Sequence, residues 1–213
     1  MMKIKIFASL SLIISGFSLL CAQKLNFKDQ NFEKAVVENF DLNKNGALEQ
    51  LEADMVTNLF LVQKGIQSAD DIKLFPNAKM IMLDDNTISS VSIVGLPRLE
   101  LFSCTGCKIS SFKGEGLKSL ASLYLDNNLL ENISLKETPR IDQLTLSLNQ
   151  LKTIDLTALK NLRKLNVEHN KILKLDISGN PALQTLNVGG NKMKETAIKM
   201  GTKTDVTVFG TEP

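Results

Sequence analysis

Oxygen-bearing side chains recur at fixed intervals between residues 41 and 52. This segment matches the pattern D-x-[DN]-x-[DN]-G-x5-E at every defined position. Calcium is a hard cation that takes six to eight oxygen ligands, and this spacing distributes them around one loop while the glycine permits its sharp turn. The predicted ligands are the side chains of Asp41, Asn43, Asn45 and Glu52, the carbonyl of Ala47, and Glu49 either directly or through water.

The charge of this loop predicts weak calcium affinity. Asn43 and Asn45 are neutral, and the chain has no second loop of this kind with which the first could pair. Ligand charge and rigidity tune affinity, so we expect a dissociation constant of ~0.1–1 mM, in the extracellular range. The alternative is that the segment serves only as a structural cap.

An amphipathic helix is predicted immediately before the loop. Phe32, Val36 and Phe40 recur every four residues, which places them on one helical face. The apolar pattern after the loop continues through Leu51 and Met55 into the next segment without a linker. We therefore expect residues 23–55 to form an EF-hand-like helix-loop-helix cap, because the end of a repeat array otherwise exposes an unpaired strand edge.

A repeat of 21 residues occupies most of the remaining chain. The segment from Leu120 to Leu130 reads L-x-x-L-x-L-x-x-N-x-L, and a fixed period of this form is the signature of leucine-rich repeats. A degenerate unit at Leu59 precedes the regular ones at an offset of 22 residues. The predicted fold is an α/β solenoid, mostly β, with a parallel concave sheet, a short extended convex side and a helical cap. The regular units begin at Ala78, Leu99, Leu120, Ile141, Leu162 and Leu183.

Each repeat is expected to contain one short strand followed by an inward-facing Asn. The Asn amide can donate to and accept from backbone groups left unpaired at the turn. We assign the repeats to residues 56–195 and a C-terminal cap strand to residues 196–213, where 205–209 alternate one residue out of register. The strands should centre on 59–61, 81–83, 102–104, 123–125, 144–146, 165–167 and 186–188.

The residues most often associated with catalysis or redox chemistry have structural interpretations here. Cys104 and Cys107 fall on the inward Leu and Asn positions of their repeat, and a zinc site would need two further ligands. Residues three apart on an extended strand lie ~10 Å apart, so we expect two free buried thiols. The single histidine, His169, is expected on the surface, and the chain is predicted not to be an enzyme.

Residues 1–22 have the pattern of a secretory signal peptide. Lys3 and Lys5 precede an apolar run that ends near Ala22, where we expect cleavage; the alternative is a lipoprotein signal with Cys21 as the lipidated residue. The run is shorter than the ~20 residues that span a bilayer. Without the two leader lysines, 23 basic residues (25 minus 2) balance 23 acidic ones. We therefore expect an exported protein that binds neither nucleic acid nor anionic membranes through its overall charge.

Apolar side chains are expected to gather on the concave face of the first four repeats. Residues that alternate with the buried leucines point outward, and an exposed apolar patch with an acidic rim is typical of a recognition surface. A protein or peptide is the expected partner, and the chain is expected to be a monomer. The alternative is that the cap covers Phe60 and Val62. The predicted partner-binding residues are Phe60, Val62, Met80, Met82, Leu101 and Tyr124, with Asp84, Asp85 and Asp126 beside them.

This layout of cap and repeats resembles secreted bacterial leucine-rich-repeat proteins of the internalin-like kind. Those proteins carry a small helical cap related to a truncated EF-hand before their repeats. The resemblance implies protein recognition, in adhesion or host contact, through the concave sheet. The complete set of calcium-loop residues departs from the truncated caps. It leaves open a second function, that of a calcium-dependent structural or sensing module of the cell envelope.

Overall fold

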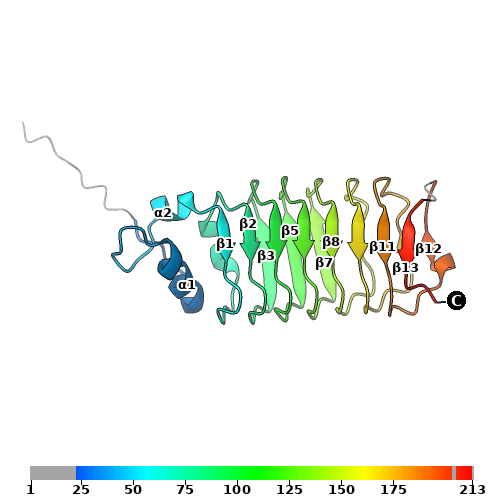
Figure 1. Ribbon diagram of the computed structural model, residues 1–213, viewed down its shortest axis with the longest axis horizontal. Helices are drawn as coiled ribbons and strands as arrows, with labels where there is room; N and C mark the ends of the chain where they lie inside the picture. Colours follow the sequence, from blue (N-terminus) through cyan, green and yellow to red (C-terminus); the bar gives the residue numbers. More distant parts are fainter. Residues whose placement is uncertain (1–22, 203–204, 213) are drawn as a thin grey trace, which may run out of the picture.

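A long parallel sheet runs along the solenoid in the computed structural model, which describes residues 23–202 and 205–212 (Figure 1). Its strands are hydrogen-bonded in the order β1-β2-β4-β6-β8-β9-β11-β13. Ile81 pairs with Phe102 and Phe102 with Leu123, which is the predicted 21-residue offset. The leucine-rich-repeat solenoid is therefore confirmed. The strands are β1 Asn58–Phe60, β2 Met80–Met82, β4 Leu101–Ser103, β6 Ser122–Tyr124, β8 Gln143–Thr145, β9 Lys164–Asn166, β11 Thr185–Asn187 and β13 Thr207–Phe209.

The paired segments begin one residue earlier than predicted. In β6, Leu123 is the middle residue and is fully buried, while Ser122 and Tyr124 on either side are half-buried on the outer face. Leu125, the second inward leucine, follows the strand at the start of the turn and is also buried. The alternation of inward and outward residues is thus as predicted, although the ladder of paired backbones is shifted.

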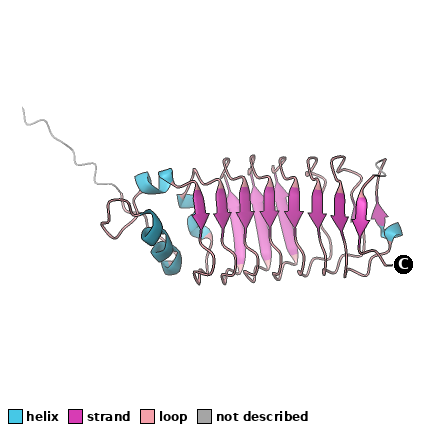
Figure 2. Ribbon diagram, viewed as in Figure 1, coloured by secondary structure: helices cyan, strands magenta, loops and turns pink. Residues whose placement is uncertain are grey.

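Further parallel strands cover the opposite side of the solenoid, where extended convex segments were predicted (Figure 2). A three-stranded parallel sheet has the order β3-β5-β7, and a two-stranded one pairs β10 with β12. No strand forms at residues 153–156, between these two sheets. The strands are β3 Ser90–Val94, β5 Ser111–Glu115, β7 Asn132–Lys136, β10 Leu175–Asp176 and β12 Ile198–Lys199, with short 3-10 helices at Asp70–Leu74 and Glu195–Ala197.

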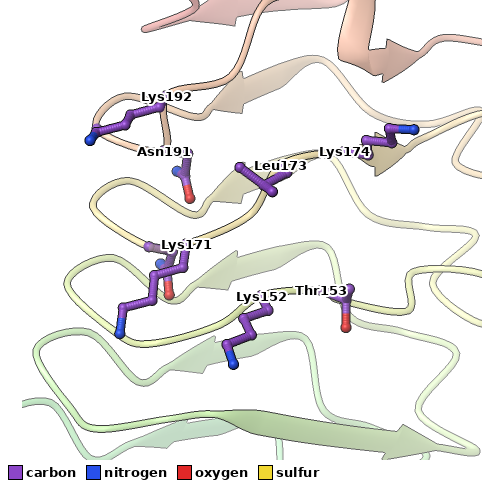
Figure 3. Close-up of a pocket in the computed structure, with 9 residues that line it drawn as sticks. Lys152, Thr153, Lys171, Leu173, Lys174, Asn191 and Lys192 are labelled. Atoms are coloured by element: carbon purple, nitrogen blue, oxygen red, sulfur yellow. The ribbon is translucent and has the colours of Figure 1, made fainter.

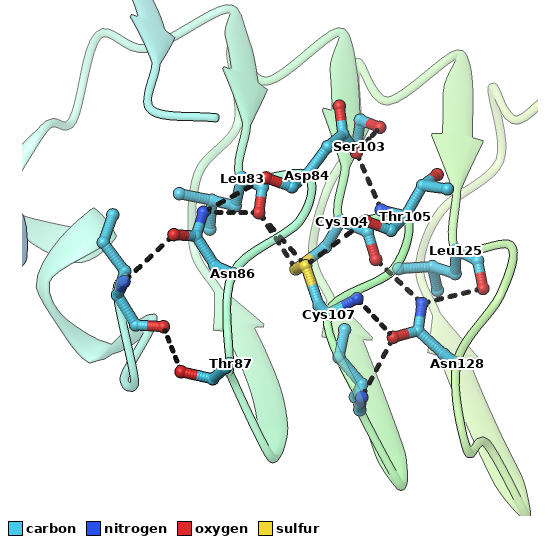
Figure 4. The surroundings of a disulfide bond; sticks show 12 residues. Leu83, Asp84, Asn86, Thr87, Ser103, Cys104, Thr105, Cys107, Leu125 and Asn128 are labelled. Atoms are coloured by element: carbon cyan, nitrogen blue, oxygen red, sulfur yellow. Dashed lines mark hydrogen bonds between the residues drawn. A yellow bond between two sulfur atoms is a disulfide. The ribbon is translucent and has the colours of Figure 1, made fainter. Parts of the chain in front are cut away.

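A ladder of buried asparagines supports the turns that leave the long sheet. Asn128 Nδ2 donates to the carbonyls of Cys104 (2.8 Å) and Leu125 (3.0 Å). Its Oδ1 accepts from the backbone N–H groups of Cys107 and Ile109, both at 3.0 Å (Figure 4). Because these bonds reach the preceding repeat, each Asn satisfies its own turn and also joins it to the neighbouring unit. The inward orientation predicted for these residues is confirmed.

The prediction of two free thiols is wrong, because Cys104 and Cys107 form a disulfide (Figure 4). The ~10 Å separation assumed an extended chain, but β4 ends at Ser103 and the backbone turns immediately afterwards. Gly106 has a φ of +69°, a left-handed conformation that glycine adopts without steric cost. The turn brings the two Cα atoms to 5.6 Å, which lies within disulfide range.

Two helices flank the calcium-type loop at the N-terminal end of the solenoid (Figure 1). They are α1 Gln30–Phe40 and α2 Gln50–Met55. Phe32 of α1 is fully buried and packs against Phe75 of the first repeat, with ring centroids 5.9 Å apart. Asp29 caps α1 and also accepts hydrogen bonds from Gln67 and Ser68, so the helix is joined to the repeats by apolar packing and by backbone hydrogen bonds.

The last strand pairs one residue out of register with the regular repeats. Leu186 of β11 pairs with Val208 of β13, an offset of 22 residues, which matches the shift seen in the sequence. Within residues 23–202 and 205–212, no helix has the length and apolarity needed to cross a membrane. The predicted signal peptide at residues 1–22 lies outside the described residues.

Candidate functional site

The loop between α1 and α2 is closed by hydrogen bonds among the predicted calcium ligands. Asp41 accepts from the backbone N–H groups of Asn45 (3.2 Å) and Gly46 (2.8 Å). The Glu49 carboxylate accepts from the side-chain amides of Asn43 (3.1 Å) and Asn45 (2.5 Å). The structure therefore gathers these side chains in one place, with the Asn43 and Asn45 amide nitrogens turned toward the Glu49 carboxylate.

Two buried carboxylates lie inside this loop without a cationic partner among the described residues. Glu49 is 5% exposed and Glu52 is 6% exposed. Burial alone would raise the pKa of the Glu52 carboxyl, but hydrogen bonds from Glu49 and from the Leu42 and Asn43 N–H groups hold it below its ordinary value. Glu52 is therefore ionised at neutral pH, as a bidentate calcium ligand must be.

The oxygen donors are suited to calcium, but their present arrangement is not a metal cage. In the described part of the chain, no group of three or more His, Cys, Asp or Glu residues is placed to hold a metal ion. Glu52 Oε1 is 2.8 Å from the Leu42 N–H that it accepts from, and this bond would have to be exchanged for a metal bond. The residue types fit calcium, and calcium binding by the loop stays a prediction.

One column of side chains runs along the outer face of the long sheet, which is the predicted concave face. Strand pairing aligns Phe60 with Met82, Met82 with Ser103, and Ser103 with Tyr124. Phe60 is 54% exposed, whereas Met82 and Tyr124 are half-buried. Beyond Tyr124 the column becomes polar and ends on a second exposed aromatic residue. These later members are Thr145, Asn166, Asn187 and Phe209.

The cap leaves this apolar patch accessible. Val62 is 37% exposed, and Met80 and Leu101 are half-buried on the neighbouring positions of the same face. The alternative that the cap covers Phe60 and Val62 is therefore contradicted. Leu42 and Met55 of the cap are themselves 65% and 60% exposed, which extends the apolar surface next to β1. Sequence analysis missed these two because Leu42 lies within the calcium-type loop and Met55 within the helical pattern that follows it.

Aspartates at every second repeat join the strands at the edge of the patch. Asp84 accepts from the backbone N–H of Thr105 at 2.7 Å and from the Ser103 hydroxyl. Asp126 accepts in the same way from the Ser147 N–H at 2.7 Å and from the Thr145 hydroxyl. Both aspartates are half-buried, so part of each carboxylate faces solvent. The hydrogen bonds that each carboxylate accepts join two adjacent repeats. Asp85 is exposed beside Asp84.

The parallel strands and the Asn ladder, with a helical segment at the N-terminal end, define a leucine-rich-repeat solenoid. The chain is similar to the solved structure of internalin C2 from Listeria monocytogenes, with a TM-score of 0.57 and 22% identity over 85% of this chain and 94% of that one. This likeness establishes the shared fold. No protein-family model matches the chain, and no curated protein matches it.

Two further solved structures show weaker similarity. One is an internalin (InlF) from Listeria monocytogenes, with a TM-score of 0.38 and 15% identity, covering 90% of this chain and 79% of that one. The other is a leucine-rich-repeat protein from Leptospira interrogans, with a TM-score of 0.46 and 16% identity, covering 76% of this chain and 56% of that one.

Proposed function

We propose that this chain is an exported, non-enzymatic recognition module whose protein or peptide partner docks on the outer face of β1, β2, β4 and β6. The observation that supports this most directly is Phe60, an aromatic residue 54% exposed at the head of a column that continues to Met82 and, beyond the buried Ser103, to Tyr124. In protein interfaces a few residues carry most of the binding energy, and aromatic side chains are prominent among them.

The surroundings of the patch indicate the chemistry of the partner. Met82 can adjust to irregular shapes, and Tyr124 combines apolar area with a polar tip. Asp84, Asp85 and Asp126 lie along one side and favour a partner with basic groups next to its apolar side chains. Export rests on residues 1–22 of the sequence, and the division into cap, repeats and closing strand is likewise part of this proposal.

Phe60→Ala is expected to weaken partner binding at least tenfold, about 1.4 kcal/mol, without unfolding the solenoid. The side chain is exposed on the first strand of the long sheet, so its removal leaves no cavity in the core. A ligand for the measurement comes from selection of a random peptide library on the wild-type protein, followed by titration with each variant. The selected peptides should combine apolar and basic residues.

Phe209→Ala is the matched control for this measurement. Phe209 is 50% exposed, compared with 54% for Phe60, and occupies the same column on the last strand of the sheet. Its replacement removes a similar apolar area from the opposite end and should change binding less than twofold. If the selected peptides bind more weakly to the Phe209 variant than to the Phe60 variant, the patch is not the docking surface. The same conclusion follows if they bind both variants as tightly as the wild type.

We infer a second, calcium-dependent role for the cap, favoured by the two buried carboxylates of the loop. Calcium at ten times its dissociation constant should stabilise the fold by ~1.4 kcal/mol, because it binds only the native loop. For a chain of this size the melting temperature should rise by ~3–6 °C. Glu52→Gln, which keeps one acceptor oxygen and loses the charge, should abolish the rise, whereas Glu38→Gln on the exposed side of α1 should retain it. A rise of equal size in the Glu52 variant would leave the loop as a structural cap only.

A further inference from the structure

A recess of about 670 Å³ opens at the edge of the solenoid, where three successive repeats turn away from the long sheet (Figure 3). Asn170 and Asn191 of the buried ladder line it, so it lies directly over the turns that follow β9 and β11. Its volume falls in the range of small-molecule sites. It belongs to the C-terminal half of the array and shares no residue with the apolar patch on β1 to β6.

The recess lies where the strands on the opposite side of the solenoid are interrupted. The first residues of β3, β5 and β7 are 21 residues apart, and Thr153 holds the next equivalent position. Thr153 is not in a strand, and pairing resumes only at Leu175 in β10. Thr153 lines the recess (Figure 3). The opening is therefore a departure from the regular repeat and not a feature that every repeat carries.

Four lysines surround this recess: Lys152, Lys171, Lys174 and Lys192 (Figure 3). No carboxylate is among the lining residues, and none of the four ammonium groups makes an ion pair or hydrogen bond within the described part of the chain. Lys171 and Lys192 occupy equivalent positions in adjacent repeats, which in the long sheet are ~4.8 Å apart. All four side chains are exposed, and their like charges contribute no attraction to one another that would stabilise the fold.

The same recess has an apolar component. Leu173 projects between the lysines and is 67% exposed, although it belongs to a segment whose neighbour Ile172 is fully buried. The methylene chains of lysine side chains also present apolar surface below their charged ends. A ligand that satisfied both features would carry negative charge at one end and an apolar body at the other.

We propose that this recess binds a small amphipathic anion, with a phosphate group held by the lysines and an apolar chain lying against Leu173. The overall charge of the protein conceals this site, because the excess of lysines here is balanced by acidic residues elsewhere. A phosphate attached to an apolar chain occurs both in soluble metabolites and in lipid headgroups, and the experiment below distinguishes these two sources.

Isothermal titration of the full chain with hexyl phosphate tests the proposal, with inorganic phosphate and hexanol as partial probes. Hexyl phosphate should bind at least tenfold more tightly than either, because only it supplies both charge and apolar contact. The variant Lys171→Gln with Lys192→Gln should lose at least tenfold in affinity for hexyl phosphate. Leu173→Ser should remove the preference over inorganic phosphate while inorganic phosphate binding is retained.

The control variant Lys64→Gln with Lys118→Gln removes the same charge from two exposed lysines outside the recess. It should bind hexyl phosphate as the wild type does. Equal losses in both double variants, or the absence of binding to every probe, would overturn the proposal. Sedimentation with phosphatidylglycerol vesicles then distinguishes the two sources. If the wild type and the control variant sediment with the vesicles and the Lys171 and Lys192 variant does not, the ligand is a lipid headgroup. If the wild type binds hexyl phosphate but not the vesicles, the ligand is a soluble anion.

Discussion

Replacing Asp29 with alanine is expected to loosen the attachment of α1 to the first repeat. One carboxylate oxygen accepts from the N–H groups of Asn31 and Phe32, both at 2.9 Å, and caps the helix. The other accepts from Gln67 at 2.7 Å and Ser68 at 2.9 Å, which belong to the loop after the first strand. One side chain therefore satisfies four backbone donors from two parts of the chain that are far apart in sequence.

The expected loss in the free energy of unfolding of the cap is about 4 kcal/mol. Removing an N-cap costs ~1 kcal/mol, and each hydrogen bond to a charged group contributes ~1.5–3 kcal/mol. Asp71, which is 1% exposed, adds to the connection by accepting from the N–H of Asp29 at 2.9 Å. Because this second carboxylate remains in the variant, the cap should loosen rather than lose every contact with the repeats.

Acid should produce the same loosening in the wild-type protein. Burial raises the pKa of the Asp29 carboxyl, but the backbone hydrogen bonds outweigh it and hold the pKa below its ordinary value of 3.8. A carboxyl whose pKa is lowered in the folded state makes its full contribution to stability when the pH is above the ordinary pKa. That contribution is lost as the pH falls from 3.8 through the lower folded-state value.

Hydrogen exchange of the amides in α1, measured against those in β6, would detect this effect. Exchange in α1 should accelerate in Asp29→Ala, while β6 should be little affected because contacts in repeat arrays extend only to neighbours. Asp70→Asn is the matched control, since Asp70 lies next to Asp71 but forms an exposed pair with Lys28. If the control variant exchanges as fast as Asp29→Ala, the buried carboxylate is not what holds the cap.

The repeat architecture could be predicted because its signal is local and repeated. Each unit places a leucine such as Leu123 and an asparagine such as Asn128 at the same spacing, so an error in one unit is corrected by the others. The register of the long sheet follows directly from that spacing. The one-residue shift at β1 and at β13 could also be predicted, because the offset of 22 residues is visible in the sequence.

Features that depend on single contacts between distant residues could not be predicted. The junction between Asp29 and Ser68 spans 39 residues and has no period that would reveal it. The disulfide was missed because the distance argument treated residues 104–107 as extended, whereas the strand ends before Cys104. The lysine recess was missed because it lies where a strand is absent at Thr153, and the sequence there alternates much like its neighbours.

The candidate site was only partly predictable, and for a physical reason. The pleat of a strand determines which residues face outward, so the column from Phe60 to Tyr124 could be identified from alternation alone. How far each side chain is exposed depends on its neighbours, and alternation does not indicate it. Ser103, in the middle of that column, is only 4% exposed because it contacts Asp84, so the patch is divided between Met82 and Tyr124.

Asn149→Ala is expected to lower the free energy of unfolding by about 3 kcal/mol. Asn149 is 3% exposed, and its Nδ2 donates to the carbonyls of Leu125 at 2.9 Å and Leu146 at 3.0 Å. Each of those carbonyls keeps a second donor in the variant, from Asn128 and from Asn170 respectively. The loss of the hydrogen bonds to these two carbonyls therefore costs only the ordinary net value of a hydrogen bond.

The larger part of the cost falls on one backbone donor. The N–H of Leu130 donates to Asn149 Oδ1 at 2.9 Å, and a buried donor without a partner costs ~1–3 kcal/mol. A loss of about 3 kcal/mol should lower the melting temperature by ~6–12 °C for a chain of this size. Asn132→Ala, in which the exposed first residue of β7 is replaced, should shift the melting temperature by less than ~2 °C. Equal melting of the two variants would mean that the buried amide ladder contributes no more than a surface asparagine, and that apolar stacking alone holds the repeats together.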